Sequence, residues 1–403
     1  MAQAENEHAS DNPRDGFQTS SARALGDNPI DLHVIGRGTC GTIYTCVDLS
    51  TSAYKIGRDR DALWNDIRLT AHVHRSLTDS ERDWKIKDYT PRVPAIKGWI
   101  ADEAKEDFWA QFAGCFTEAE DKKTAPFLFS LSLIPTLGPE VRQALMTRYE
   151  FTTSTATVFA NPENDFCLVR PYLGLATRKD EPLCRSDNLW NFPLTREDLR
   201  SFPFDDNLAM ELAKEMATGL AIIHWHALVD GMDIEFVLGG ANDWDGQQVI
   251  LASDLETSEP FCSSSPPNLV LGAPMSKPNW RKQNRWDRTY HMSDEMRLYV
   301  LDFDKASLLS FDRPEAAIQR LVTSVTCNDP YFPDPTATED GGRQLWNAFR
   351  ATYLETAHSV SKPLRRTYGK RARGWPLWFM GQWEKKAEQL SGGRNGEFIE
   401  FGD

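Results

Sequence analysis

The sequence has few of the features that are typical of secreted or membrane proteins. Its seven cysteines include no CxxC pair, so neither a disulfide framework nor a zinc finger is indicated. No run reaches the roughly 18 apolar residues that span a bilayer, and the N-terminus lacks a charged-then-apolar signal pattern. We therefore expect a cytoplasmic protein without membrane association or a metal site. Its 403 residues, 40% of them hydrophobic, suffice for a substantial core.

Net charge is −14, which argues against indiscriminate coating of nucleic acid, but the charge is unevenly distributed. Residues 277–288 carry five cations and one carboxylate, and residues 361–388 carry eight cations and two carboxylates. Tryptophan, tyrosine or phenylalanine is interleaved in both stretches. These two basic-aromatic stretches are candidates for contact with a polyanion.

The pattern of the first half predicts a disordered tail followed by a small sheet. Residues 1–28 are polar and have few large apolar side chains to offset the entropy of ordering. Short β-type runs, HVIG, TIYTCV and SAYKI, follow and predict three antiparallel strands. Residues 61–77 have helical periodicity, and 102–160 is interpreted as an insertion with mixed helix.

The second half predicts mainly helices. The strongest helix signal places Leu208, Leu212 and Leu220 on one face, with Asp205 or Asp206 as N-cap. The runs FVLGG and RLYVLDFDKA read as short strands, and helices are expected around 312–325 and 342–360.

A GxGxxG motif formed by Gly36, Gly38 and Gly41 lies between two predicted strands. A dinucleotide-binding fingerprint opens a helix, whereas the glycine loop of a protein kinase joins two strands so that backbone N–H groups approach phosphates. The kinase context fits. The alternative is that these glycines only shape a hairpin.

Lys55 lies in the third predicted strand, and the next helix offers Asp66. A kinase pairs a lysine of this strand with a helix carboxylate and holds an anion there. The alternative is a solvated lysine on the polar face of the strand.

The sequence VDGMDIEFVL places Asp230, Asp233 and Glu235 where a kinase carries its catalytic loop. The later LDFD places Asp302 like the aspartate of a metal-binding Asp-Phe-Gly element, with Asp304 instead of glycine. Order and spacing agree across four elements.

We therefore expect an α+β, protein-kinase-like two-lobed fold, with a small antiparallel-sheet N-lobe and a mainly helical C-lobe. The expected divisions are the tail 1–28, the N-lobe 29–175 including the insertion, the C-lobe 176–360, and a basic-aromatic segment with a polar tail at 361–403.

Two histidines and one cysteine are further candidates for a chemical role. His224 and His226 point to different sides of a helix and are expected to be packing residues, because a metal pair needs one face. Cys40, in the glycine loop, is a possible acyl-accepting nucleophile, but no base is adjacent in the sequence.

The departures from a kinase indicate a cationic substrate. Asp230 has no basic neighbour, Glu235 replaces the metal-binding asparagine, and three carboxylates in six residues repel a nucleotide triphosphate unless metals intervene. A guanidinium suits this arrangement, because it can donate two hydrogen bonds to one carboxylate.

The segments VDGMDIEFVLGG, LYVLDFDKA, CNDPYFPDP and LWNAFRATYLETA resemble those of a kinase-like fungal family that includes the arginine-containing cyclodipeptide synthases. Members are often labelled hypothetical or zinc-finger-like. The resemblance covers roughly residues 30–360. It implies that arginyl-tRNA and a second aminoacyl-tRNA are partners, and that they condense to a cyclo-Arg-Xaa diketopiperazine in secondary metabolism without ATP or another cofactor.

The family's acidic motif has adjacent aspartates, which this chain lacks. The resemblance therefore suggests Asp230, Asp233 and Glu235 as catalytic residues, with Lys55, Asp302 and the three glycines binding substrate. The cations expected to contact RNA phosphates are Arg281, Lys282, Arg285, Arg365, Arg366, Lys370, Arg371 and Arg373.

Two other functions stay open, as does a purely structural role for the basic-aromatic stretches. One is a magnesium- and ATP-dependent phosphotransferase acting on a small cation, with Asp230 as base, Asp302 and Glu235 on magnesium and Lys55 on phosphate. The other is a pseudokinase-like binding module without catalysis.

Overall fold

The computed structural model describes residues 32–46, 51–84, 86, 90–116, 125–148, 150–151, 153–166, 168–175, 184–185, 189–201, 207–241, 250, 255, 259–262 and 296–393. The expected tail at 1–28 and the basic stretch at 277–288, with Arg281, Lys282 and Arg285, lie outside these residues. The two candidates for the N-cap of the long helix, Asp205 and Asp206, also lie outside them.

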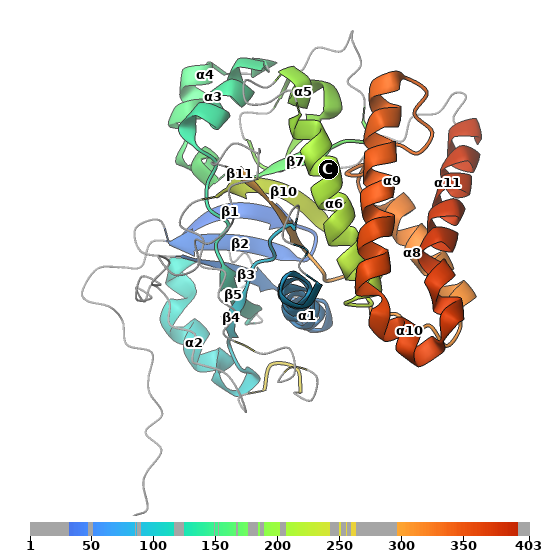
Figure 1. Cartoon of the computed structure of the whole chain (residues 1–403). Helices are drawn as coiled ribbons and strands as arrows, with labels where there is room; N and C mark the ends of the chain where they lie inside the picture. The colour runs from blue at the N-terminus through green and yellow to red at the C-terminus, as the bar shows by residue number, and fades with distance from the viewer. Residues whose placement is uncertain are drawn as a thin grey trace, which may run out of the picture.

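A five-stranded antiparallel sheet forms the N-terminal part (Figure 1). Its first three strands, β1 (Leu32–Gly38), β2 (Gly41–Cys46) and β3 (Ser52–Gly57), are the three predicted from the sequence. Next to β3 lies β5 (Phe127–Ser132), and β4 (Ile96–Trp99) forms the edge. The interpretation of 102–160 as an insertion was wrong in this respect, because β5 is an interior strand of the sheet.

Helix α1 (Arg60–Trp84) packs between this sheet and the helical part, and contains the predicted helix 61–77. Asp59 caps its start, since Asp59 Oδ1 accepts hydrogen bonds from the N–H groups of Asp61 and Ala62. Leu63 and Ile67 are fully buried. The helix thereby carries Asp66, which is also buried, to a fixed position beside the sheet.

A second sheet has the order β11-β10-β7-β9. Its antiparallel strands β10 (Glu235–Gly240) and β11 (Met296–Leu301) are the FVLGG and RLYVL segments, with Glu235 opposite Leu301. Strand β7 (Val169–Tyr172) pairs with β10 and runs parallel to β9 (Phe192–Thr195). The expected boundary at residue 175 was therefore misplaced, because β7 belongs to this sheet.

The C-terminal part is helical. The predicted helices are α6 (Leu208–Trp225), α8 (Pro314–Cys327) and α9 (Asp340–Val360), and α6 packs along α9 (Figure 1). The N-cap of α6 is Asn207. After α10 (Lys362–Tyr368), α11 (Trp375–Gly393) packs on α8 and α9. Helix α11 contributes Trp375, Phe379 and Trp383 to the main hydrophobic core, beside residues of the predicted C-lobe.

Shorter elements complete the fold. They are α2 (Lys105–Phe112), α3 (Pro139–Arg148), β6 (Glu150–Phe151), α4 (Thr155–Ala160), β8 (Cys184–Arg185) and α5 (Arg196–Ser201). Short 3₁₀ turns lie at Asp102–Ala104, Ala113–Cys115, Pro162–Phe166 and, as η5, Lys370–Gly374. The architecture is α+β, with a small antiparallel sheet and a helical part, and no helix among the described residues is long and apolar enough to span a membrane.

Candidate functional site

Lys55 joins three parts of the fold. From β3 its Nζ lies 2.6 Å from Asp66 Oδ2 on α1 and 2.7 Å from Asp302 Oδ1 at the end of β11. The predicted pairing with Asp66 is confirmed, as is the proximity to Asp302. Burial alone lowers the pKa of Lys55, but the two carboxylates raise it above its usual value, so the ammonium is charged.

The backbone after β11 is shaped to present Asp302. Its φ of +64° is in the left-handed region, and the next residue, Phe303, is fully buried. The Phe303 N–H donates to Asp66 Oδ1, so α1 holds this turn as well as Lys55. Burial raises the pKa of Asp302 to about 6, with Lys55 opposing and Asp66 and Asp304 reinforcing the rise.

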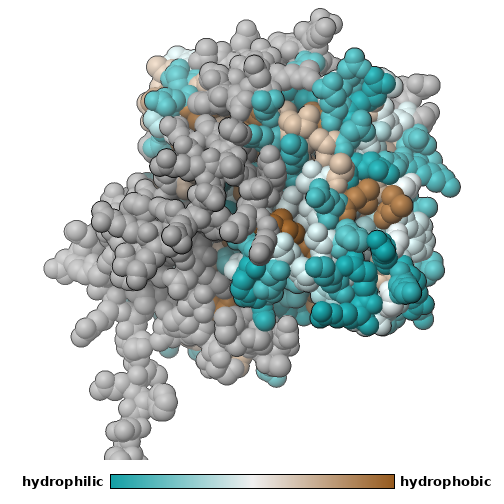
Figure 2. All heavy atoms as spheres, viewed as in Figure 1, coloured by the Kyte–Doolittle hydropathy of each residue, from teal (hydrophilic) through white to brown (hydrophobic). Residues whose placement is uncertain are grey.

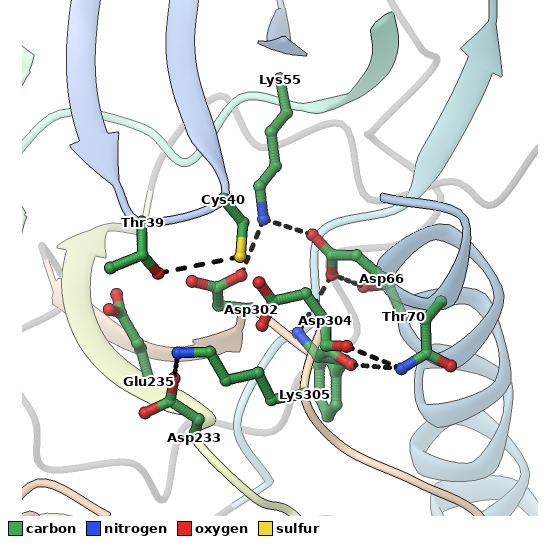
Figure 3. Close-up of polar contacts among 12 residues, drawn as sticks. Thr39, Cys40, Lys55, Asp66, Thr70, Asp233, Glu235, Asp302, Asp304 and Lys305 are labelled. Carbon is green, nitrogen blue, oxygen red and sulfur yellow. Dashed lines mark hydrogen bonds and ion pairs between the residues drawn. The ribbon is translucent and has the colours of Figure 1, made fainter. Parts of the chain in front are cut away.

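Asp304 lies next to Asp302 and is 7% exposed. Its Oδ1 accepts no hydrogen bond from any described residue. The backbone at Asp304 is fixed, because Asn65 Nδ2 on α1 donates to the carbonyls of Asp304 and Ala306 at 2.9 and 2.8 Å. Figure 3 shows Asp302 and Asp304 side by side beneath Cys40. An unsatisfied buried carboxylate oxygen is costly, and a donor or cation would relieve that cost.

The turn between β1 and β2 covers this group of carboxylates (Figure 3). A Cβ on Gly41 would lie 2.2 Å from the carbonyl oxygen of Ile56, so the β2–β3 pairing requires glycine there. A Cβ on Gly38 would meet no atom within 4 Å, and one on Gly36 would make ordinary contact with Ile43. The sheet therefore accounts for Gly41, but steric contact explains neither of the other two glycines.

Cys40, at the tip of this turn, lies 3.7 Å from Thr39 Oγ1. Burial and a hydrogen bond with Asp304 raise the pKa of its thiol. The sequence showed no base near Cys40, whereas the fold brings the Asp304 carboxylate to it. The thiol is nonetheless less ionised than usual, which does not favour a free thiolate nucleophile.

Asp230 does not share a surface with the other two predicted catalytic carboxylates. Its side chain is fully buried, and Oδ1 accepts hydrogen bonds from the N–H groups of Met232 and Ser307 at 3.2 and 2.9 Å. Oδ2 accepts from Arg320 Nε on α8 at 2.5 Å. Both oxygens are thus used within the fold. We therefore correct the interpretation of Asp230 as a catalytic base to that of a residue that shapes the loop.

Asp233 and Glu235 lie near Asp302 and Asp304 (Figure 3), and each pairs with a different cation. Asp233 is half-exposed and pairs with Lys305 Nζ at 2.5 Å. Glu235, the first residue of β10, pairs with Arg170 of β7. Burial raises the pKa of Glu235 to about 7, with Arg170 opposing and Asp302 and Asp329 adding to the rise. Glu235 is therefore half-protonated close to neutral pH.

Arg170 and Asn328, which sequence reasoning missed, hold the acidic segment in place. Arg170 also pairs with Asp329 Oδ2 at 3.2 Å. Asn328 Oδ1 accepts from the Asp233 N–H at 2.7 Å, while Asn328 Nδ2 donates to the Gly231 carbonyl at 2.8 Å. The available signal was the segment CNDPYFPDP, which contains both Asn328 and Asp329, and the arginine in the apolar run that forms β7.

His224 of α6 has the packing role that was expected. His224 is fully buried, and its Nδ1 lies 2.8 Å from Tyr353 Oη of α9. Burial lowers the pKa of His224 to about 3, so the ring is neutral. Among the residues that the structure describes, no group of three or more histidine, cysteine, aspartate or glutamate side chains has metal-binding geometry.

The basic segment 361–388 presents its cations but not most of its aromatic rings. Arg366, Lys370, Arg371 and Arg373 are exposed and Arg365 is partly buried. Stacking of RNA bases on several aromatic rings there is ruled out by burial: Trp375, Phe379 and Trp383 lie in the core, and only Trp378, at 37%, is exposed. Tyr368 packs against Trp375.

Comparison with known families gives one match. A model described as "DUF3669: Zinc finger protein" matches residues 298–363, from β11 to the start of α10. This segment contains Cys327 and His358 as its only cysteine and histidine, fewer than the four ligands of a structural zinc site. A search of curated proteins found no match.

Proposed function

We propose that the two parts of this molecule form a protein-kinase-like fold whose cleft binds a cationic substrate. Support for the fold comes from the strand–glycine turn–strand order, the lysine of β3 paired with a helix carboxylate, and the Asp-Phe element that follows β11. The order of these three features along the chain matches that of a kinase.

The observation that carries the proposed substrate class is the excess of negative charge. Asp233, Glu235, Asp302 and Asp304 surround the space under the β1–β2 turn, and Lys55 is already paired with two carboxylates (Figure 3). Burial is the main cause of the raised pKa values of Glu235 and Asp302, and neighbouring carboxylates add to the rise. A guanidinium offers five N–H donors and a permanent positive charge, so it suits this site better than a nucleotide phosphate.

The reaction we propose is the one implied by the resemblance, synthesis of a cyclo-Arg-Xaa dipeptide from arginyl-tRNA and a second aminoacyl-tRNA. The free carboxylate oxygen of Asp304, with Asp302 beside it, would bind the arginine side chain. Glu235, with a pKa of about 7, has the proton affinity of a general base.

In the first step the amine of one aminoacyl group attacks the ester carbonyl of the other. A C–N bond forms, the bond from the carbonyl carbon to the tRNA ribose oxygen breaks, and the amine proton passes through Glu235 to the leaving hydroxyl. A second attack of the same kind, on the remaining ester, closes the ring and releases the second tRNA. No oxidant or ATP is needed, because both esters are already activated.

The test is mass spectrometry of metabolites from a host that expresses the chain, beside the same host with the Glu235→Gln variant. We expect an arginine-containing cyclic dipeptide with the chain and at least a 100-fold smaller signal with the variant at equal protein level. Glu388→Gln, which neutralises an exposed carboxylate on α11, is the control. Absence of any such dipeptide with the unmodified chain contradicts the proposal.

A phosphotransferase is the second candidate, favoured by the Lys55–Asp66–Asp302 arrangement. In that reading Lys55 binds phosphate, Asp302 and Glu235 would hold magnesium, and the ion would neutralise the charge of the transferred phosphoryl group. The buried Asp230 cannot serve as its base without leaving its three hydrogen bonds. Tight magnesium-dependent ATP binding would favour this candidate over the first.

A further inference from the structure

A cavity away from the acidic cleft is lined by cations. It has a volume of about 360 Å³ and lies where the end of α9, α10 and η5 meet, lined by His358, Arg365, Gly369, Lys370 and Arg373. Its size is at the low end of small-ligand pockets, which run from roughly 300 to 1,000 Å³. No carboxylate is among the residues that line it. The surface over α10, at the lower right of Figure 2, is mainly hydrophilic.

Two of these cations are not used by the fold. Arg365 has a structural role, because its Nη1 donates to the His358 carbonyl at 2.8 Å and to Ser361 Oγ at 3.2 Å. The side chains of Lys370 and Arg373, in contrast, make no hydrogen bond or ion pair with any residue that the structure describes. Gly369, with φ of +75°, makes the sharp turn that starts η5 and brings Lys370 to the pocket.

The positive charges around the pocket affect the pKa of His358. Burial lowers the pKa of its imidazole, and the charges of Arg365, Arg373 and Lys362 lower it further. Every charge that acts on this ring is positive, in a chain whose net charge is −14. A site that concentrates unpaired cations against the average of the molecule favours an anion with several acceptor oxygens.

We infer that this pocket binds a phosphate group, with Lys370 and Arg373 as its direct ligands and Arg365 as the residue that forms the wall. A phosphate of the tRNA backbone is one source of this group, and this assignment rests on the proposed function. In that case the helical part binds the RNA at this pocket. Phosphate binding itself does not depend on the reaction in the cleft.

The test uses the full-length protein and inorganic pyrophosphate in low-salt calorimetric titrations. We expect saturable binding of one pyrophosphate, weakened about tenfold or more by Lys370→Glu and by Arg373→Glu, because each removes a charged hydrogen-bond donor. Lys385→Glu and Lys386→Glu are matched controls, since these cations of α11 belong to the same basic segment but do not line the pocket. Their affinity should stay within about twofold of the unmodified protein.

The NMR titration of His358 gives an independent readout. A bound anion favours the imidazolium, so pyrophosphate should raise the pKa of His358 in the unmodified protein but not in Lys370→Glu. Non-saturable binding of pyrophosphate, or an equal loss of affinity in the control variants, overturns the assignment of this pocket as a phosphate site. Competition between total tRNA and pyrophosphate supports RNA as the source; pyrophosphate binding without competition overturns that source, whatever the outcome of the dipeptide assay.

Discussion

Neutralising Glu235 should change how the cleft responds to pH. Burial raises the pKa of Glu235 from its ordinary 4.5 to about 7, so ionising it costs more in the folded protein than in the unfolded chain. The folded state therefore binds more protons between these values, and stability falls as pH rises from 4.5 to 7, by up to about 3 kcal/mol. A bound cation offsets this cost, because it stabilises the carboxylate.

The same pKa gives the size of the effect on binding. If the cation binds only when Glu235 is ionised, its affinity at pH 5.5 should be about 30-fold weaker than at pH 8. Asp302, with a pKa of about 6, adds about a fourfold dependence of its own over this interval. In Glu235→Gln only this smaller dependence should remain.

Agmatine is a suitable probe, because both of its charged groups stay protonated over this pH range. Calorimetric titration at pH 5.5 and pH 8 measures the affinity ratio for the unmodified protein, for Glu235→Gln and for the exposed control Glu388→Gln. Putrescine, which lacks the guanidinium, should bind more weakly. The same pH dependence in Glu235→Gln and in the unmodified protein, or tighter binding at pH 5.5, refutes the reasoning.

Three stability predictions follow from individual contacts. Lys55→Met should lower the free energy of unfolding at pH 7 by about 3–5 kcal/mol in urea denaturation, because it leaves the buried Asp66 and the partly buried Asp302 unpaired. The loss should be smaller at pH 5, below the pKa of about 6 of Asp302, and a loss below about 1 kcal/mol at pH 7 contradicts the ion-pair assignment. Asp230→Asn should lower the free energy of unfolding by about 2–4 kcal/mol, because Asp230 is buried and accepts hydrogen bonds from three donors. Asp233→Asn should lower it by no more than about 0.5 kcal/mol, because Asp233 is half-exposed. Equal shifts of the melting temperature for the two variants would refute the structural role of Asp230. Asn328→Ala should cost about 1–3 kcal/mol, because it breaks the hydrogen bonds to the Gly231 carbonyl and the Asp233 N–H, and an unchanged melting temperature is incompatible with that clamp.

The sequence was sufficient where local pattern and spacing decide the structure. Alternation predicted the first three strands, and helical periodicity predicted α1, α6, α8 and α9. The pairing of Lys55 with Asp66 was predictable because a strand and the helix after it fix the separation of the two side chains.

What the sequence could not show depends on contacts between distant segments. Strand β5 was missed because its place in the sheet depends on pairing with β3 and β4 rather than on its own pattern. The inward turn of Asp230 depends on Ser307 and Arg320, which lie 77 and 90 residues away along the chain. The burial of Trp375 and Trp383 could not be predicted, because exposure cannot be read from a basic-aromatic composition.

The central claim is tested most directly with purified protein, arginyl-tRNA and a second aminoacyl-tRNA, in the absence of ATP, with the product identified by mass spectrometry. We expect a cyclic arginine-containing dipeptide, reduced at least about 100-fold by Glu235→Gln. No cyclic dipeptide from the unmodified protein without ATP, across the set of second aminoacyl-tRNAs, would contradict it.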